Sequence, residues 1–188
     1  MRIISGIFKG KKILEPKDLK TRPLKDMVKE SIFNIINHSN KFDIKLDSSY
    51  VLDLFSGVGS FGLECLSRGA KYVVFCENYQ GVLPILKKNL LKIKPLHNFE
   101  IIEKNIYNEF ASFNSNNKFD IIFLDPPYKD KNLEILLNNI KEREILGLNG
   151  IIIIHRHKNE TVIIPENYEI KEEKNYGLSK IVFLTNLN

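Results

Sequence analysis

Short apolar runs alternate along most of the chain with longer segments in which apolar positions follow helical spacing. The apolar runs predict strands at residues 50–54, 72–76, 99–102, 121–124 and 151–154. The helical spacing predicts helices at residues 61–68, 81–93, 106–113 and 133–140. Strands and helices that alternate with short connections predict a parallel sheet covered by helices on both faces.

The pattern changes after the fifth predicted strand, where Gly147 to Gly150 is interpreted as the turn that leads into it. Two strand-like runs, 168–172 and 180–185, then flank the turn residues Asn175-Tyr176-Gly177 and predict a terminal hairpin. The whole pattern therefore predicts an α/β fold with a seven-stranded sheet that is mostly parallel and has an antiparallel last strand.

The first 25 residues do not follow this alternation. Residues 2–14 form short strand-like runs around Gly6 and Gly10 and predict a hairpin, and residues 15–25 are irregular. A helix capped by Asp26 is expected to follow, up to about residue 37. We therefore expect a basic N-terminal extension at 1–25 and a main domain at 26–188.

Composition limits the class of protein. Hydrophobic residues make up 43% and charged residues 27% of the 188 residues, which is typical of a globular domain. No apolar run has the length of a membrane span and the first residues lack the pattern of a signal peptide, so no membrane association and a cytoplasmic location are expected. Cys65 and Cys76 have no metal-ligand spacing and are expected in the core, and no metal site is predicted.

The net charge of +5 and the isoelectric point near 9.0 are mild for a nucleic-acid-binding protein, so the position of the charges is more informative than their sum. Basic residues gather in the N-terminal extension, where Pro23 stiffens the loop that presents Arg22. If the extension folds beside the site described next, these residues would contact phosphates. The alternative is an ordinary solvated surface.

Asp125-Pro126-Pro127-Tyr128 follows directly after the apolar run 121–124 and is the most informative motif in the chain. Two consecutive prolines fix two φ angles and remove two backbone donors, so the chain leaves the sheet in one defined direction. The Asp125 carboxylate and the Pro126 carbonyl could both accept from an exocyclic amine, and Tyr128 offers a flat face to a planar ring. The motif predicts a platform that orients the amino group of a base.

A glycine-containing loop, from Asp53 to Gly62, follows the first predicted strand, and Glu77 lies twenty residues after Gly57. This spacing also occurs in dinucleotide-binding folds, so an NAD-dependent oxidoreductase is an alternative. Asp53 precedes the glycines, however, and a carboxylate there would oppose a pyrophosphate but could bind an ammonium. S-adenosylmethionine carries such an ammonium and has no phosphate.

These motifs together resemble a class I S-adenosylmethionine-dependent methyltransferase with a Rossmann-like fold. The N-terminal motifs at 2–6, 10–12, 21–23 and 29–34 narrow the resemblance to the bacterial 16S ribosomal RNA guanine-N2 methyltransferase family. The resemblance implies methylation of the N2 amine of a guanine in small-subunit ribosomal RNA, with this RNA or an assembling ribosomal particle as partner. A monomer is a separate expectation, which no motif in the sequence determines.

The resemblance also assigns roles to residues. The catalytic platform comprises Asp125, Pro126, Pro127 and Tyr128. The residues expected to bind S-adenosylmethionine are Asp53, Phe55, Ser56, Gly57, Gly59, Glu77, Asn78, Asn105, Ile106 and Asp125. The residues expected to bind RNA are Arg2, Lys9, Lys11, Lys12 and Arg22.

The chain departs from the family pattern at a few positions. His155 stands where a glutamate is common, Asn78 replaces an acid, and Asn105 replaces an aspartate but keeps an oxygen that can accept from an adenine amine. His155, Arg156 and His157 are interpreted as a polar strand end. Besides the oxidoreductase, two alternatives stay open: methylation of an adenine or cytosine amine in DNA, and an inactive RNA-binding assembly factor.

Overall fold

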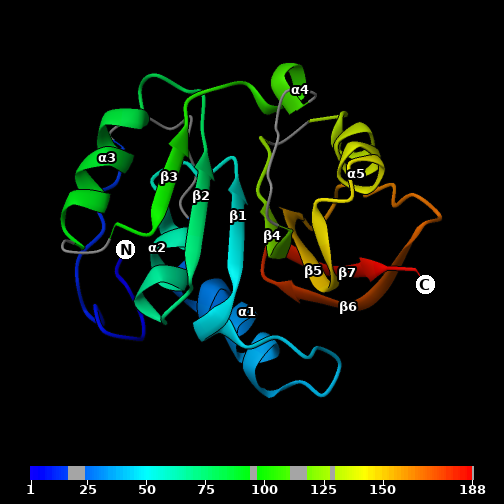
Figure 1. The fold of residues 1–188 in the computed structure, drawn as a ribbon, viewed down its shortest axis with the longest axis horizontal. Coiled ribbons are helices and arrows are strands. Elements are labelled where there is room, and N and C mark those ends of the chain that lie inside the picture. The colour runs from blue at the N-terminus through cyan, green and yellow to red at the C-terminus, as the bar shows by residue number, and fades with distance from the viewer. Residues whose placement is uncertain (17–23, 94–96, 111–117, 128–129, 188) are drawn as a thin grey trace.

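A computed structural model describes residues 1–16, 24–93, 97–110, 118–127 and 130–187. Its centre is one seven-stranded sheet with the strand order β3-β2-β1-β4-β5-β7-β6 (Figure 1). The strands are β1 (Tyr50–Leu54), β2 (Tyr72–Cys76), β3 (Phe99–Ile102), β4 (Phe119–Leu124), β5 (Leu146–His157), β6 (Tyr168–Tyr176) and β7 (Ser179–Asn186). Only β7 runs antiparallel to its neighbours β5 and β6, which confirms the predicted mostly parallel sheet.

Helices cover both faces of the sheet, as Figure 1 shows. They are α1 (Asp26–His38), α2 (Ser60–Ser67), α3 (Leu83–Leu91), α4 (Ile106–Glu109) and α5 (Leu133–Glu142), with a short 3-10 turn, η1, at Leu46–Ser48. Side chains alternate between the faces of a strand, so Val51 of β1 joins the core under α1, α2 and α3, whereas Leu52 joins the core under α4 and α5. Both faces of the central strands are buried, which is why these strands read as continuous apolar runs.

A stack of three aromatic rings joins α1, α2 and β4 in the first core. The Phe61 ring lies 5.3 Å from that of Phe33 and 4.1 Å from that of Phe123, measured between centroids. All three side chains are buried. The stack therefore fixes the position of α2, whose first turn follows the glycine-containing loop, relative to β4, which ends just before Asp125.

The strand β5 begins earlier than the sequence predicts. Residues Gly147 to Gly150, expected as a turn, lie within the strand, because Leu146 already pairs with Phe119. The register then shifts between Phe119 and Ile121, and the irregular stretch leaves Leu148 83% exposed. The prediction of a turn was wrong at this point because a bulged strand uses the same glycine and asparagine residues.

The N-terminal segment 1–16 crosses the outer side of α2 rather than standing away from the domain. A single antiparallel bridge joins Arg2 to Lys12, and the side chains of Ile3, Phe8 and Ile13 are buried in the core under α1, α2 and α3. Gly6 passes so close to the end of α2 that an added Cβ would lie 1.8 Å from the Ser67 carbonyl oxygen. The division of the chain at residue 25 stays a prediction.

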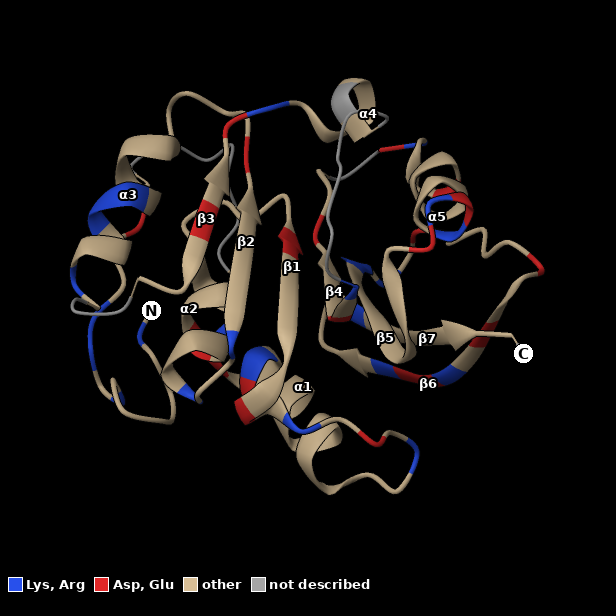
Figure 2. Cartoon of the chain, in the orientation of Figure 1, with Lys and Arg blue, Asp and Glu red and all other residues tan. Residues whose placement is uncertain are grey.

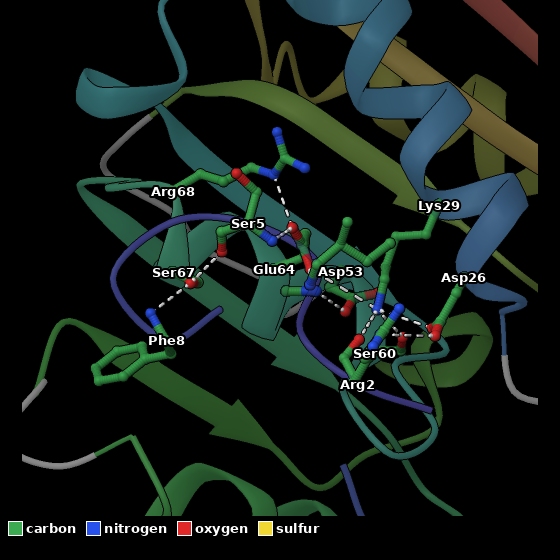
Figure 3. A network of polar contacts seen from close by, with 12 residues as sticks. Arg2, Ser5, Phe8, Asp26, Lys29, Asp53, Ser60, Glu64, Ser67 and Arg68 are labelled. Carbon is green, nitrogen blue, oxygen red and sulfur yellow. Dashed lines mark hydrogen bonds and ion pairs between the residues drawn. The ribbon is translucent and has the colours of Figure 1, made fainter. Parts of the chain in front are cut away.

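A buried polar network, shown in Figure 3, attaches this segment to α1 and α2. The fully buried Glu64 carboxylate accepts from the backbone N–H groups of Ile4 at 2.7 Å and Ser5 at 2.9 Å, and from Arg68 Nε at 2.8 Å. The equally buried Lys29 donates to the Arg2 carbonyl at 2.8 Å and to Ser60 Oγ at 3.2 Å. Its ammonium lies 3.8 Å from Glu64, so the two buried charges compensate each other.

Two further observations concern the expectations from composition. Both cysteines are free thiols buried in the cores, as predicted. In the described part of the chain, none of the helices is long and apolar enough to cross a membrane.

Candidate active site at the carboxyl edge of the sheet

The strand order reverses between β1 and β4, and ligands of open α/β sheets bind at such a switch point, outside the carboxyl ends of the strands. Leu54 pairs with Leu124, and Leu124 pairs with Ile154. This register brings the residues that follow β1, β4 and the apolar part of β5 to one edge of the sheet. The glycine-containing loop, Asp125 and His155 therefore lie at neighbouring strand ends.

The glycine-containing loop owes its shape to several residues in left-handed conformations. Phe55, Gly57 and Gly59 have φ angles of 62°, 55° and 83°. At Gly59, the positive φ angle strains any other residue, and an added Cβ would also lie 2.6 Å from Leu86 Cδ1 of α3, so glycine is strongly favoured here. Ser56 Oγ donates toward the carbonyls of Asp53 at 2.8 Å and Cys76 at 3.0 Å, which fixes the loop to both strands.

Asp53 is buried at the base of this loop, with 1% of its surface exposed. Its Oδ2 accepts from the Gly62 N–H at 3.0 Å, in the first turn of α2. Burial raises the pKa of Asp53 well above its usual value, the hydrogen bond from Gly62 lowers it, and the charges of Asp125 and Glu77 raise it further. None of the described residues donates to its other oxygen, which is available to a ligand with a positive charge.

Glu77 follows β2 and lies beside the same loop. Its Oε2 accepts from the Gly57 N–H at 2.8 Å, and its Oε1 accepts from the N–H groups of Asn78 at 2.9 Å and Tyr79 at 2.8 Å. These three bonds hold the carboxylate at the strand end, half-buried. The Asn78 side chain is exposed.

Asn105 is the N-cap of α4, which follows β3, and Ile106 is the first residue of this helix. The Asn105 side chain caps this helix by accepting from the Tyr107 N–H at 3.1 Å, so the oxygen expected for an adenine amine already accepts one bond, and Ile106 is buried. The Tyr107 ring lies 5.5 Å from that of Phe55, and its hydroxyl donates to Asp130 Oδ2 at 2.8 Å. Burial raises the pKa of Tyr107, and the bond to Asp130 raises it further, so the hydroxyl stays protonated.

The predicted platform begins where β4 ends. The Asp125 N–H donates to the Leu54 carbonyl at 3.4 Å, which continues the ladder between β4 and β1 by one residue. Pro126 is buried and Pro127 is exposed. Tyr128 lies outside the described residues, so its stacking role stays a prediction.

Two residues that the sequence analysis interpreted as a polar strand end instead support this platform. Arg156 is 3% exposed, and its Nη1 donates to the carbonyls of Pro126 at 3.3 Å and Pro127 at 3.1 Å, while Nη2 donates to the Asp130 carbonyl at 3.1 Å. His155 Nδ1 lies 2.9 Å from Asp125 Oδ1. The sequence contains one signal for this contact. The apolar runs 121–124 and 151–154 have equal lengths, and if they pair in register as parallel strands, the residues that follow them, Asp125 and His155, become neighbours.

The described basic residues that are expected to bind RNA differ in whether their side chains already contact other protein groups. Lys11 donates to the Lys92 carbonyl at 2.8 Å near the end of α3 and lies over the Phe8 ring, 4.5 Å from its centroid. Lys92 in turn donates to the Lys12 carbonyl at 3.0 Å, and Figure 2 shows basic residues on α3 and on the N-terminal segment beside it. Arg2 is exposed with its Nε 4.0 Å from Asp26.

Lys9 and Lys12 are exposed, and no described residue bonds to their ammonium groups. Lys9 lies in the turn after Gly6, near the end of α2 farther from the glycine-containing loop. Arg22 lies outside the described residues. The structure therefore brings the expected cofactor residues and Asp125 to one edge. It places the described basic residues along the N-terminal segment beside α1, α2 and α3, with Lys9 at the end of α2 farther from that edge.

Comparison with known proteins identifies the family. The family described as Conserved hypothetical protein 95 matches residues 1–185. Ribosomal RNA small subunit methyltransferase D of Haemophilus influenzae is 34% identical over 95% of this chain and 90% of its own length, and the protein of the same name from Escherichia coli is 30% identical over 94% and 85%.

The solved structure of the Escherichia coli protein yhhF covers 99% of this chain and 97% of its own, with a TM-score of 0.81 and 29% identity. These matches span the N-terminal segment, the glycine-containing loop and the strand ends, and they confirm the resemblance and the fold that the sequence motifs predict. The chain belongs to the Conserved hypothetical protein 95 family, together with these small-subunit ribosomal RNA methyltransferases.

Proposed function

We propose that this protein transfers a methyl group from S-adenosylmethionine to the exocyclic N2 amine of a guanine in small-subunit ribosomal RNA. One observation carries the proposal: the carboxyl groups of Asp53, Glu77 and Asp125 lie at the carboxyl ends of three adjacent strands, β1, β2 and β4. Such a site attracts a cationic ligand. S-adenosylmethionine has a positive sulfonium and an ammonium group.

The donor set fits this cosubstrate better than a dinucleotide. Asp53 has an oxygen available for an ammonium, and Glu77 stands at the second strand end, where a ribose diol would donate to it. A pyrophosphate at the same loop would be repelled by the carboxylate of Glu77 and by that of Asp53 in its ionised state, which disfavours the NAD-dependent alternative.

The chain supplies the positioning for the reaction. S-adenosylmethionine provides the methyl group as an electrophile on sulfur. Asp125 accepts a hydrogen bond from one N–H of the guanine amine. The Pro126 carbonyl oxygen, which accepts from Arg156 with one of its two lone pairs, accepts from the second N–H with the other. Together the two acceptors direct the lone pair of the amine nitrogen toward the methyl group. As the C–N bond forms and the C–S bond breaks, the amine releases one proton, which passes through Asp125 to water.

The names of the relatives support ribosomal RNA as the substrate class. A guanine amine inside a helix is inaccessible, so the base must turn out of its stack to reach Asp125. Lys9 and Lys12 contact phosphates in this scheme, with no information about base sequence. Action as a monomer in the cytoplasm stays part of the proposal.

The experiment compares Asp125→Ala with a matched control, Asp43→Ala, whose carboxylate is exposed at the opposite edge of the sheet. Each purified protein is incubated with S-adenosylmethionine and either free small-subunit RNA or assembled subunits, and methylated nucleosides are identified by mass. We expect N2-methylguanosine with the wild type and the control. Asp125→Ala should still bind the cosubstrate, more weakly because Asp125 is itself one of the expected cosubstrate-binding residues. At saturating cosubstrate it should lose at least about a hundredfold in methyl transfer, as expected for the loss of an orienting acceptor.

Two results would contradict the proposal. Unchanged turnover in Asp125→Ala would remove the platform from the reaction. Methylation of adenine or cytosine in DNA, with none in ribosomal RNA, would favour the alternative substrate, and binding of NAD instead of S-adenosylmethionine in calorimetry would favour the oxidoreductase.

A further inference from the structure

His155 lies between the proposed platform and the last strand of the sheet. Its Nδ1 is 2.9 Å from Asp125 Oδ1, and its Nε2 is 2.9 Å from Ser179 Oγ on β7. Only 8% of the imidazole side chain is exposed, compared with 21% for the Asp125 side chain. Both ring nitrogens are thus engaged, and the ring has one defined orientation against the carboxylate.

This arrangement accommodates two protonation states of the ring without movement. In the neutral state, Nδ1–H donates to Asp125 and Nε2 accepts from the Ser179 hydroxyl. In the imidazolium state, Nε2–H donates to the same hydroxyl, which can accept as well as donate. The contacts of His155 therefore persist through its titration, and only the charge facing Asp125 changes.

The charged groups around the ring decide where it titrates. Asp125 faces it from the end of β4, Ser179 from β7, and Arg156 is its neighbour on β5. Burial lowers the pKa of His155, but the charge of Asp125 and the hydrogen bond to it raise the pKa by more, and Arg156 opposes them in part. The net result is a pKa above the usual value of 6.5.

Resting on the proposed function, we propose that His155 is a positioning residue for Asp125 and that its protonation state sets how strongly this carboxylate accepts from the guanine amine. The neutral ring holds Oδ1 and leaves the full negative charge on the carboxylate. The imidazolium forms an ion pair that draws this charge toward Oδ1 and weakens Oδ2 as an acceptor. Methyl transfer should therefore fall as the pH drops through the pKa of His155.

The test is the pH dependence of single-turnover methyl transfer at saturating S-adenosylmethionine and RNA, from about pH 5.5 to 9. His155→Asn keeps an amide N–H close to the position of Nδ1 but does not titrate. We expect the wild-type rate to fall about fivefold as the pH drops below the pKa of His155. This is the effect expected when the charge of the acceptor, the Asp125 carboxylate, is partly neutralised by the imidazolium. The His155→Asn profile should lack this step while its binding of S-adenosylmethionine is unchanged.

His97→Gln is the matched control, since His97 is exposed before β3 at the opposite edge of the sheet, and it should keep the wild-type profile. A second measurement does not depend on activity. The ring resonances of His155, followed by NMR, should titrate above the usual pKa in the wild type and at lower pH in Asp125→Asn, because the carboxylate charge is gone.

The outcomes separate this inference from the proposed function. An acid step that persists unchanged in His155→Asn, or an imidazole pKa that is the same in Asp125→Asn as in the wild type, would overturn the role of His155. Absence of methyl transfer by the wild type at every pH would instead overturn the proposed function, and the inference with it.

Discussion

Replacing Arg156 by methionine tests how the strand β5 holds the loop that follows β4. The guanidinium donates three hydrogen bonds to carbonyls of this loop, and its Nη2 also lies 2.7 Å from Glu160 Oε2. Methionine keeps the apolar stem and removes every donor. Arg156→Met therefore leaves the packing of β5 nearly intact and releases the three carbonyls.

The magnitude follows from the environment of each group. A hydrogen bond to a charged group contributes about 1.5–3 kcal/mol. The bonds to the Pro127 and Asp130 carbonyls are only partly buried, so these carbonyls can bind water once released, whereas the bond to the Pro126 carbonyl is buried, and the three contributions do not simply add. Removing one partner of a buried ion pair leaves the other charge uncompensated, and this lowers the free energy of unfolding by about 3–5 kcal/mol. Glu160 is 22% exposed in its side chain, so we expect a loss near the lower end, about 3 kcal/mol.

Two comparisons isolate the effect on the loop. The double variant Arg156→Met/Glu160→Gln removes the unpaired charge, and its free energy of unfolding should recover part of the loss. Arg156→Lys keeps the charge, but one ammonium cannot reproduce the planar fork that reaches three carbonyls, so it should not restore activity. Chemical denaturation, calorimetry with S-adenosylmethionine and single-turnover methyl transfer measure stability, binding and reaction separately.

We expect all three variants to bind S-adenosylmethionine within about threefold of the wild type, because the hydrogen bonds and the ion pair of Arg156 go to the loop after β4 and to Glu160 rather than to the glycine-containing loop. Their rate of methyl transfer should fall at least about tenfold, since a displacement of about 1 Å at the platform is enough to reduce the rate greatly. A folded Arg156→Met protein with the wild-type rate would refute this reasoning, because the two prolines alone would then hold the loop in place.

Two further predictions concern the buried acid and the basic surface. Asp53→Asn should raise the melting temperature at neutral pH and weaken S-adenosylmethionine binding by roughly ten- to a hundredfold. Burial raises the pKa of Asp53 in the folded protein, so the wild type loses stability when this carboxyl group ionises. The gain in stability of Asp53→Asn over the wild type is therefore largest above the raised pKa, and it disappears as the pH falls to the usual pKa of an aspartate. A lower melting temperature of Asp53→Asn at neutral pH would contradict this. Lys9→Gln and Lys12→Gln should each reduce the salt dependence of RNA binding by about one phosphate contact, whereas Lys118→Gln at the start of β4 should not, and equal salt slopes in all three would identify the lysines as solvated surface.

The order of elements could be predicted from the sequence because buried parallel strands leave a strong local signal. Runs such as 121–124 and 151–154 are apolar on both faces, and turn residues limit them. The early start of β5 could not be predicted in this way. Gly147 and Gly150 indicate a turn locally, and only the pairing of Leu146 with Phe119, a contact between distant residues, makes this stretch a strand.

The supporting residues of the site were missed for a related reason. Lys29 and Glu64 lie in predicted helices, where a charged residue usually indicates the solvated face, yet both are fully buried. Arg156 comes shortly after the apolar run 151–154, where a polar residue usually indicates the solvent-exposed end of a strand. In each case the burial depends on a partner at least 26 residues away in the sequence, Glu64 for Lys29 and Asp130 for Arg156, and no local pattern contains that information.

The charges at the carboxyl edge also explain why the two ligands of the proposed reaction would occupy different strands. Asp53 and Glu77, at the ends of β1 and β2, bind only backbone N–H groups among the described residues. No side chain therefore compensates the charge of Glu77, or that of Asp53 in its ionised state, which a cationic ligand favours. Asp125, at the end of β4, has His155 beside it, and Arg156 lies behind the following carbonyls. A cationic cosubstrate is therefore favoured over β1 and β2. The neutral amine of a base needs an oriented hydrogen-bond acceptor rather than a strong negative potential, so it is favoured over β4. The boundary between the two sites then lies between β1 and β4, where the strand order reverses.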